Sequence, residues 1–230
     1  WNMGIYRKSP VNNETLVYNV KDFDMTWGQA GHSTSAPSQD HAPTPAPSPA
    51  PTPEAASQPA PAAAGKVLKG SSANNALSGT SGDDKIYGRA GNDKLIGRGG
   101  NDELSGSSGN DRLYGGSGND VLKGGAGRDS FVFNTKLGAS NVDRVSGFSV
   151  KDDTVRLDNA IFGKLGKAGK LKKGFFTIGS EAKDKNDYVV YDKKKGILYY
   201  DADGSGQGEA VMFAKIAKNL KMTHDDFYVI

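Results

Sequence analysis

One carboxylate recurs at every ninth residue through the middle of the chain. The aspartates are Asp84, Asp93, Asp102, Asp111, Asp120 and Asp129. Each lies two residues before an apolar side chain, from Ile86 in the first repeat to Phe131 in the last. Evenly spaced carboxylates can bind a hard cation, because hard cations prefer oxygen ligands. The chain has no Cys, so thiolate metal sites, disulfides and thiol catalysis are excluded.

The aspartates belong to six consecutive nonapeptides that run from 79 to 132. Each block has Gly first and fourth, Asp sixth and an apolar residue eighth. A degraded block at 70–78 precedes them, with Asn75 in place of Asp. Thirteen of the 31 glycines occupy the first and fourth positions. This period indicates a repeat architecture rather than a disordered, glycine-rich segment.

The nine-residue period predicts a coil with two facing strands. We expect a three-residue strand and a six-residue turn in each block, with the eighth side chain directed inward. Two blocks, or 18 residues, then make one coil, and successive coils stack at the ~4.8 Å spacing of a sheet. The predicted fold is all-β: a calcium-bound parallel β-helix, or β-roll, with a β-rich C-terminal cap.

Stacking the coils places the aspartates above one another. Asp84 lies below Asp102, and Asp102 below Asp120, with the same order on the other side. Such carboxylates repel unless a cation lies between them. Ca²⁺ fits, because it accepts six to eight oxygen ligands in flexible geometry, whereas Mg²⁺ demands a tighter octahedron. If these residues only formed turns, Asn, Ser or Gly would serve equally at the sixth position. We therefore expect several Ca²⁺ ions and folding coupled to their binding.

The nonapeptides resemble the RTX (hemolysin-type) calcium-binding repeat family of secreted bacterial proteins. The resemblance extends into the capping segment that follows such repeats, where Asp143, Phe148, Asp153 and Leu157 match and Gly147 replaces a common Asp. It implies that Asp143 and Asp153 are further calcium ligands; the alternative is that they are turn and surface residues. In this family the second position is often Gly, whereas this chain has Thr80, Arg89, Arg98 and Ser107.

Two C-terminal motifs carry alternative interpretations. The segment "DADGSG" at 201–206 matches half of an EF-hand loop, but Met212 stands where the bidentate Glu belongs, so a hairpin turn and a calcium site both remain open. The terminal "HDDFYVI" resembles the uncleaved signal that type I secretion machinery reads, and it could also be an ordinary terminal strand.

Composition divides the chain into four segments. Residues 1–28 have strand-like alternation, and Gly4, Ile5 and Tyr6 resemble the terminal strands of jelly-roll polysaccharide lyases. We interpret 1–28 as the end of an upstream β-sandwich domain. Residues 29–65 hold nine of the ten prolines and form a linker. The β-roll is expected over 66–133, and the cap and secretion-signal region over 134–230.

These features favour a calcium-binding module over other classes of protein. A net charge of +3 gives no basis for a nucleic-acid partner, and no apolar run is long enough to span a membrane. We expect an extracellular module of a Gram-negative-type bacterium that folds on Ca²⁺ and supports type I secretion of an attached cargo. The alternatives are the tail of a secreted polysaccharide lyase or hydrolase, and a structural or adhesive module that contacts polysaccharide or cell-surface glycans. No catalytic constellation is recognisable, so enzyme activity stays open.

Overall fold

The computed structural model describes residues 6–8, 15–17 and 64–230, which fall into two units, 1–56 and 57–230. In the first unit, β1 (Tyr6–Lys8) pairs antiparallel with β2 (Thr15–Val17). The expected linker lies outside the described residues, apart from residues 64 and 65. Gly4 and Ile5 of the lyase-like motif are also outside them.

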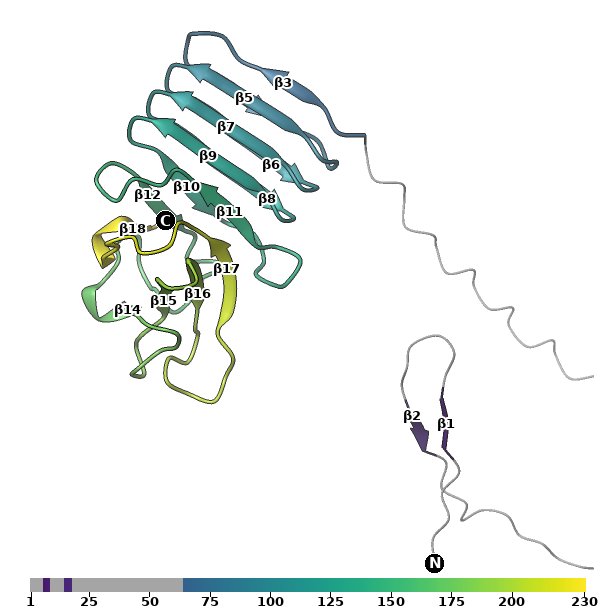
Figure 1. The fold of residues 1–230 in the computed structure, drawn as a ribbon, viewed down its shortest axis with the longest axis vertical. Helices are drawn as coiled ribbons and strands as arrows, with labels where there is room; N and C mark the ends of the chain where they lie inside the picture. Colours follow the sequence, from purple (N-terminus) through teal and green to yellow (C-terminus); the bar gives the residue numbers. More distant parts are fainter. Residues whose placement is uncertain (1–5, 9–14, 18–63) are drawn as a thin grey trace, which may run out of the picture. The chain divides into compact units, whose positions relative to one another are not determined.

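The second unit is all-β, as predicted, and consists of two sheets (Figure 1). The seven-stranded sheet has the order β13-β18-β12-β10-β8-β6-β4, and the nine-stranded sheet has the order β14-β15-β16-β17-β11-β9-β7-β5-β3. The repeat strands are β3 (Val67–Lys69), β4 (Ala76–Ser78), β5 (Lys85–Ala90), β6 (Lys94–Gly99), β7 (Glu103–Ser108), β8 (Arg112–Ser117), β9 (Val121–Ala126) and β10 (Ser130–Phe133).

The remaining strands form the C-terminal part of the two sheets. They are β11 (Asp143–Ser146), β12 (Thr154–Leu157), β13 (Gly169–Lys170), β14 (Phe176–Ile178), β15 (Val189–Asp192), β16 (Ile197–Tyr200), β17 (Val211–Lys215) and β18 (Phe227–Val229). The 3₁₀ turns η1 (Lys173–Phe175) and η2 (His224–Asp226) are the helical elements of the described residues. Within these ranges, no helix has the length and apolar character that a membrane span requires.

Strand pairing follows the predicted 18-residue coil. Odd and even repeat strands alternate between the two sheets, and each pairs in parallel with the strand two along the chain. Leu104 of β7 lies opposite Ile86 and Leu122 in one sheet. Leu95 lies opposite Leu113 in the other sheet. These eighth-position side chains are fully buried between the sheets, so the predicted β-roll is confirmed.

The strands are longer than the sequence indicates. From β5 to β9 each strand has six residues instead of the expected three, and it includes the first three positions of the following nonapeptide. Pairing continues through the glycine, as in Arg89 opposite Ser107. Our prediction counted only the alternating apolar residue, and it treated every glycine as part of a turn.

The coil continues beyond the nonapeptides. In β11, Val145 lies opposite Leu122, and in β12, Val155 lies opposite Phe131. Strands β17 and β18 then add in parallel to β11 and β12. The last residue of the chain, Ile230, donates its backbone N–H to Leu157 O at 2.9 Å. The C-terminal segment therefore covers the end of a solenoid that would otherwise expose its core and unpaired backbone groups.

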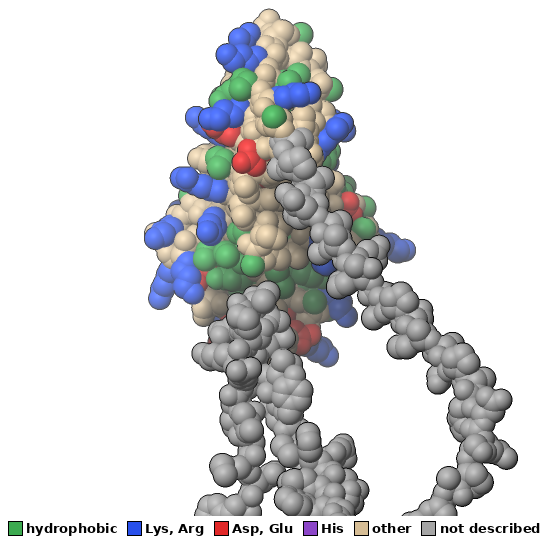
Figure 2. Space-filling view, turned by 90° about the vertical axis from the view of Figure 1, so that its right-hand side faces the viewer, with side chains coloured by type: hydrophobic (Ala, Val, Ile, Leu, Met, Phe, Trp, Pro, Cys, Tyr) green, Lys and Arg blue, Asp and Glu red, His purple; other side chains and the backbone are tan. Residues whose placement is uncertain are grey.

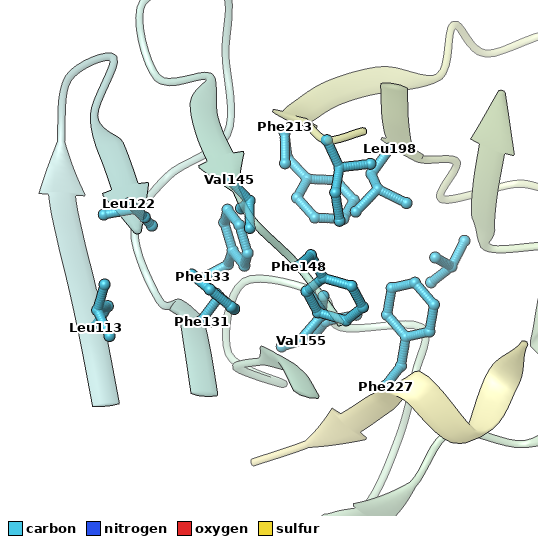
Figure 3. Close-up of a cluster of buried hydrophobic side chains, with 14 of the residues drawn as sticks. Leu113, Leu122, Phe131, Phe133, Val145, Phe148, Val155, Leu198, Phe213 and Phe227 are labelled. Carbon is cyan, nitrogen blue, oxygen red and sulfur yellow. The ribbon is translucent and has the colours of Figure 1, made fainter. Parts of the chain in front are cut away.

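The core widens from the repeats to the cap (Figure 3). In the repeats it consists of the facing eighth-position side chains, such as Leu113 and Leu122. In the cap it becomes aromatic, with Phe213 in edge-to-face contact with Phe133 and Phe162 at ring-centroid distances of 5.1 and 5.2 Å. Edge-to-face pairs add about 0.5–1.5 kcal/mol each beyond their buried area. The cap can therefore anchor a repeat array whose own core is thin.

The first-position glycines leave space for the carboxylate five residues later. A Cβ on Gly97 would overlap Oδ2 of Asp102 and the carbonyl oxygen of Gly115. The same overlap with the sixth-position carboxylate occurs at Gly88 and Gly106. Gly99 is different, because its Cβ would meet no atom closer than 3.7 Å. The first glycine is therefore required by packing rather than by turn formation alone.

We predict that Gly97→Ala destabilises the calcium-bound fold by more than about 2 kcal/mol, since overpacking a filled site typically costs 1–3 kcal/mol. Gly99→Ala is the matched control, and it should change stability by less than about 1 kcal/mol. Urea denaturation of both variants in saturating Ca²⁺ measures the difference. Equal stability of the two variants would show that the carboxylate does not occupy the space beside Gly97.

Candidate metal site

Each sixth-position aspartate is hydrogen-bonded to the coil before it. Its Oδ1 accepts the backbone N–H of the residue 18 positions earlier, as in Asp102 from Asp84 at 2.7 Å and Asp120 from Asp102 at 2.8 Å. The same bond joins Asp111 to the amide of Asp93 at 2.7 Å. The aspartates are at most 2% exposed. The predicted stacking of residues 18 apart is therefore present, with a backbone amide between successive carboxylates.

Asp143 and Asp153 continue this pattern beyond the repeats. Asp143 Oδ1 accepts the N–H of Asp120 at 3.1 Å, and Asp153 Oδ1 accepts the N–H of Asp129 at 2.9 Å. Their separations of 23 and 24 residues show that the inserted loops do not disturb the stacking. We call these two rows the aspartate ladders: Asp84, Asp102, Asp120 and Asp143 in one, and Asp93, Asp111, Asp129 and Asp153 in the other.

The second carboxylate oxygen distinguishes the members of the ladders. In five aspartates Oδ2 is buried and has no hydrogen-bond partner: Asp93, Asp102, Asp111, Asp120 and Asp129. Asp84 Oδ2 instead accepts the backbone N–H of Thr80 at 2.5 Å, and Asp153 Oδ2 accepts that of Ser149 at 2.9 Å. A buried carboxylate oxygen without a partner is costly, and a bound cation would remove that cost.

The backbone four residues earlier explains this difference. At the five aspartates with a free Oδ2, the second-position residue has a positive φ, which ranges from 80° at Arg89 to 117° at Gly125. Thr80 and Ser149 do not have a positive φ, and their N–H groups reach the carboxylate. Three non-glycine residues, Arg89, Arg98 and Ser107, hold this conformation, which is unfavourable for them. We call a turn open where the second-position φ is positive and the aspartate Oδ2 is free. We call it closed where the N–H of that residue donates to Oδ2.

The fifth position has a role that the sequence analysis did not identify. Its side-chain oxygen accepts the backbone N–H of a residue in the next coil, 18 positions later within the repeats and 23 positions later at Asn119. Asn101 Oδ1, for example, accepts the N–H of Asn119 at 2.9 Å. Asn92 accepts from Asn110 at 2.7 Å, and Asn119 accepts from Val142 at 2.9 Å. This row runs opposite in direction to the aspartate ladders. The signal was present in the sequence, because the position is Asn or Asp in every block before Arg128.

Burial changes the acidity of the ladders. Desolvation raises the pKa of Asp102, Asp120 and Asp129 to about 6 and that of Asp143 to about 8, where the neighbouring Asp120 charge adds to the effect. At Asp84 burial also acts to raise the pKa, but the Thr80 and Lys66 amides outweigh it, so the pKa is lowered. These four raised pKa values show that ionisation of Asp102, Asp120, Asp129 and Asp143 is costly without a compensating positive charge.

The donor set fits a hard cation that accepts carbonyl ligands. Among the described residues, no three His, Cys, Asp or Glu side chains surround one point. An ion beside a free Oδ2 would therefore take its remaining ligands from turn carbonyls. A groove lined by Asn92, Asp93, Asn110, Asp111 and Arg128 follows these turns on one side. Oxygen-only ligation with few carboxylates per ion suits Ca²⁺ and excludes metals that need thiolate or imidazole.

The EF-hand-like segment forms the loop between the antiparallel strands β16 and β17. Asp203 N–H donates to Asp201 Oδ1 at 3.3 Å, and Gly208 N–H donates to Asp203 Oδ2 at 3.0 Å. A Cβ on Gly206 would overlap the Asp203 carboxylate. The loop's own backbone thus binds its acidic side chains, which favours the hairpin-turn alternative.

Comparison with known protein families matches residues 69–104 and 96–131 to the RTX calcium-binding nonapeptide repeat. This stretch of the chain consists of such repeats, which bind Ca²⁺ ions, and proteins that carry them are generally secreted. A comparison with curated proteins finds no match.

Two solved structures are among those similar to this chain. One is the extracellular lipase LipA from Serratia marcescens, with 21% identity and a TM-score of 0.30; 71% of this chain and 21% of the lipase are covered. The other is the AlgE6R3 subunit of the Azotobacter vinelandii mannuronan C5-epimerase, with 25% identity and a TM-score of 0.29; 69% of this chain and 79% of that subunit are covered. The chain thus spans about a fifth of the lipase.

We predict that Asp102→Asn raises the calcium concentration at the folding midpoint about tenfold, equivalent to ~1.4 kcal/mol, because a free Oδ2 of an open turn is lost. Asp84→Asn is the matched control and should change the midpoint less than twofold. Its Oδ2 already has an amide partner, and Asn75 accepts the Ser71 N–H at 2.7 Å in the equivalent place. Calcium titrations followed by circular dichroism compare the two. An equal shift in both variants would contradict the division into open and closed turns.

Proposed function

We propose that this chain is a calcium-triggered folding module that leaves the cell by type I secretion and folds outside it with an attached cargo. The observation that carries the proposal is the set of five buried carboxylate oxygens without a hydrogen-bond partner. These carboxylates are buried in the turns of the coil, where a bound cation would compensate their charge. Without the cation, the aspartate ladders oppose folding.

Of the eight ladder aspartates expected to bind calcium, we propose six as ligands and the other two, Asp84 and Asp153, as supports of the stacked coils. Asp93, Asp102, Asp111, Asp120 and Asp129 lie in open turns and would each contribute Oδ2. Asp84 and Asp153 lie in closed turns at one end of each ladder, and their Oδ1 atoms accept the N–H groups of Lys66 and Asp129 in the preceding coil. Asp143 extends its ladder into the cap, and its strongly raised pKa supports a site in which a cation balances it together with Asp120.

The position of the C-terminus supports an order of events. Phe227 and Val229 of the "HDDFYVI" segment are at most 1% exposed, and β18 is paired with β12. A machinery that reads this segment would have to do so before the module folds. Low calcium inside the cell would keep the segment available, and extracellular calcium, to which such modules bind at about 10⁻⁴–10⁻³ M, would then close the fold.

Each of the four segments of the chain has a proposed role in a larger protein. We propose that 1–28 ends an upstream β-sandwich cargo domain, 29–65 is the spacer, 66–133 is the calcium-binding roll and 134–230 is the cap with the export signal. The parallel stacking of β11 and β12 on β9 and β10 supports a cap that completes the same coil. A polysaccharide-degrading cargo is compatible with this arrangement, and its catalytic residues would lie upstream.

Circular dichroism during a calcium titration tests the proposal. We expect a cooperative gain of β-sheet signal as Ca²⁺ rises to the millimolar range, and no comparable gain with Mg²⁺ at the same concentration. Cooperativity is expected because the ladder bonds join each coil to the next. A chain that is fully folded in excess chelator would overturn the folding switch and would favour a constitutive scaffold.

A further inference from the structure

In residues 64–230, acidic side chains are buried far more often than basic side chains. Residues 64–230 contain 26 Lys and Arg against 21 Asp and Glu, a difference of only five. Twelve of the 21 acidic residues are buried, whereas none of the 26 basic residues is, so nine acidic residues remain at the surface. The side drawn in Figure 2 shows this imbalance, with many more Lys and Arg than acidic side chains. The near-neutral composition therefore conceals a basic surface.

One sheet face concentrates this charge beside aromatic rings. We call it the cationic face: Lys94, Arg112, Tyr114, Arg156, Lys170 and Tyr228, all on the outer side of the seven-stranded sheet. Lys94 lies opposite Arg112, and Arg156 lies opposite Tyr228, which in turn pairs with Lys170. Lys94 Nζ lies 5.2 Å from the Tyr114 ring centroid, and Arg156 Cζ lies 5.1 Å from that of Tyr228.

Few acidic groups oppose these cations. The strands of this sheet carry no acidic residue, and Asp225 of the η2 turn is paired with Lys170 at 3.2 Å. The opposite sheet differs, since Lys85 there pairs with Glu103 of the next strand at 3.2 Å. Neighbouring strands are ~4.8 Å apart, but β10, which lies between β8 and β12, presents Ser130 and Val132 on this face. The face thus carries two groups of positive charges and rings, one on β6 and β8 and the other on β12, β18 and β13.

We propose that the cationic face binds an acidic polysaccharide laid across the strands. Carboxylates along the polysaccharide would pair with the Lys and Arg side chains, and its flat sugar rings would pack on Tyr114 and Tyr228. The two groups would contact separate stretches of one polysaccharide chain, and the stretch between them would lie over β10. A membrane surface fits less well, because Tyr228 is the single large exposed apolar side chain of this face. This site is independent of export.

Binding should require calcium. The face forms only when the strands are stacked, and stacking depends on compensating the ladders. Ca²⁺ would also neutralise the buried aspartates, which otherwise weaken the positive potential of Lys94 and Arg112 beside Asp93 and Asp111. The same ion would thus allow the cationic face to form and would increase its positive potential.

The test uses the full 230-residue chain in saturating Ca²⁺ and a fluorescent hyaluronan oligosaccharide, whose uronates carry the negative charge. Anisotropy should show binding that weakens with added salt, and neutral dextran should not bind. The double variant Lys94→Gln/Arg112→Gln should lose about tenfold in affinity. The control Lys69→Gln/Lys123→Gln removes the same charge from the opposite sheet and should lose less than twofold. Circular dichroism confirms that both variants fold.

Three results would overturn the proposal: no binding of hyaluronan, an equal loss in both double variants, or tighter binding to duplex DNA or to anionic phospholipid vesicles. If the first double variant does not fold, Tyr114→Leu replaces it. That substitution keeps the charge and removes the ring, so a loss of hyaluronan binding supports stacking, and unchanged binding contradicts it. None of these outcomes depends on the export of the chain.

Discussion

Two rows of buried carboxylates are the feature on which the rest of this structure depends. Each ladder aspartate uses one oxygen to hold the coil before it through a backbone amide, as Asp102 does with Asp84. The other oxygen is left for a cation in the interior turns. The hydrogen bonds that stack the coils and the charge that resists stacking thus belong to the same side chain. We therefore propose that stability and calcium binding are coupled in this module.

The other positions of the nonapeptide determine the space and the hydrogen bonds available to this carboxylate. The first glycine leaves room for it, and the positive φ of the second residue turns the competing N–H away. The fifth residue ties the turn to the following coil through its side-chain oxygen. Closed turns at Asp84 and Asp153 end the ladders with protein amides in place of an ion. Because many acidic side chains are buried and the basic side chains are not, the surface carries an excess of positive charge.

The sequence predicted the fold well because its period is strict. An invariant nine-residue step fixes which residues stack, so Asp84 and Asp102 were paired correctly, as were Ile86 and Leu104. Strand length was predicted wrongly, because glycine in a strand looks the same as glycine in a turn when read from sequence. The role of the fifth position was missed for a similar reason, since Asn is common in turns whether or not it bonds to a neighbouring coil.

The division between open and closed turns was beyond the sequence. Arg89 and Thr80 both replace a common second-position glycine, yet only Arg89 adopts a positive φ. No pattern in the sequence at these two positions distinguishes the two turns. Asp143 and Asp153 were identified by resemblance, and their stacking positions became clear only once the loops before them were placed.

Residue-resolved amide hydrogen exchange tests the central claim most directly. The relevant amides are those of Asp84, Asp93, Asp102 and Asp111, which donate to ladder carboxylates. The account predicts strong protection in Ca²⁺ and loss of protection at all four together when calcium is removed, because no ladder can stand with its charges uncompensated. Equal protection with and without calcium would contradict the claim that the buried carboxylates make the fold depend on the ion.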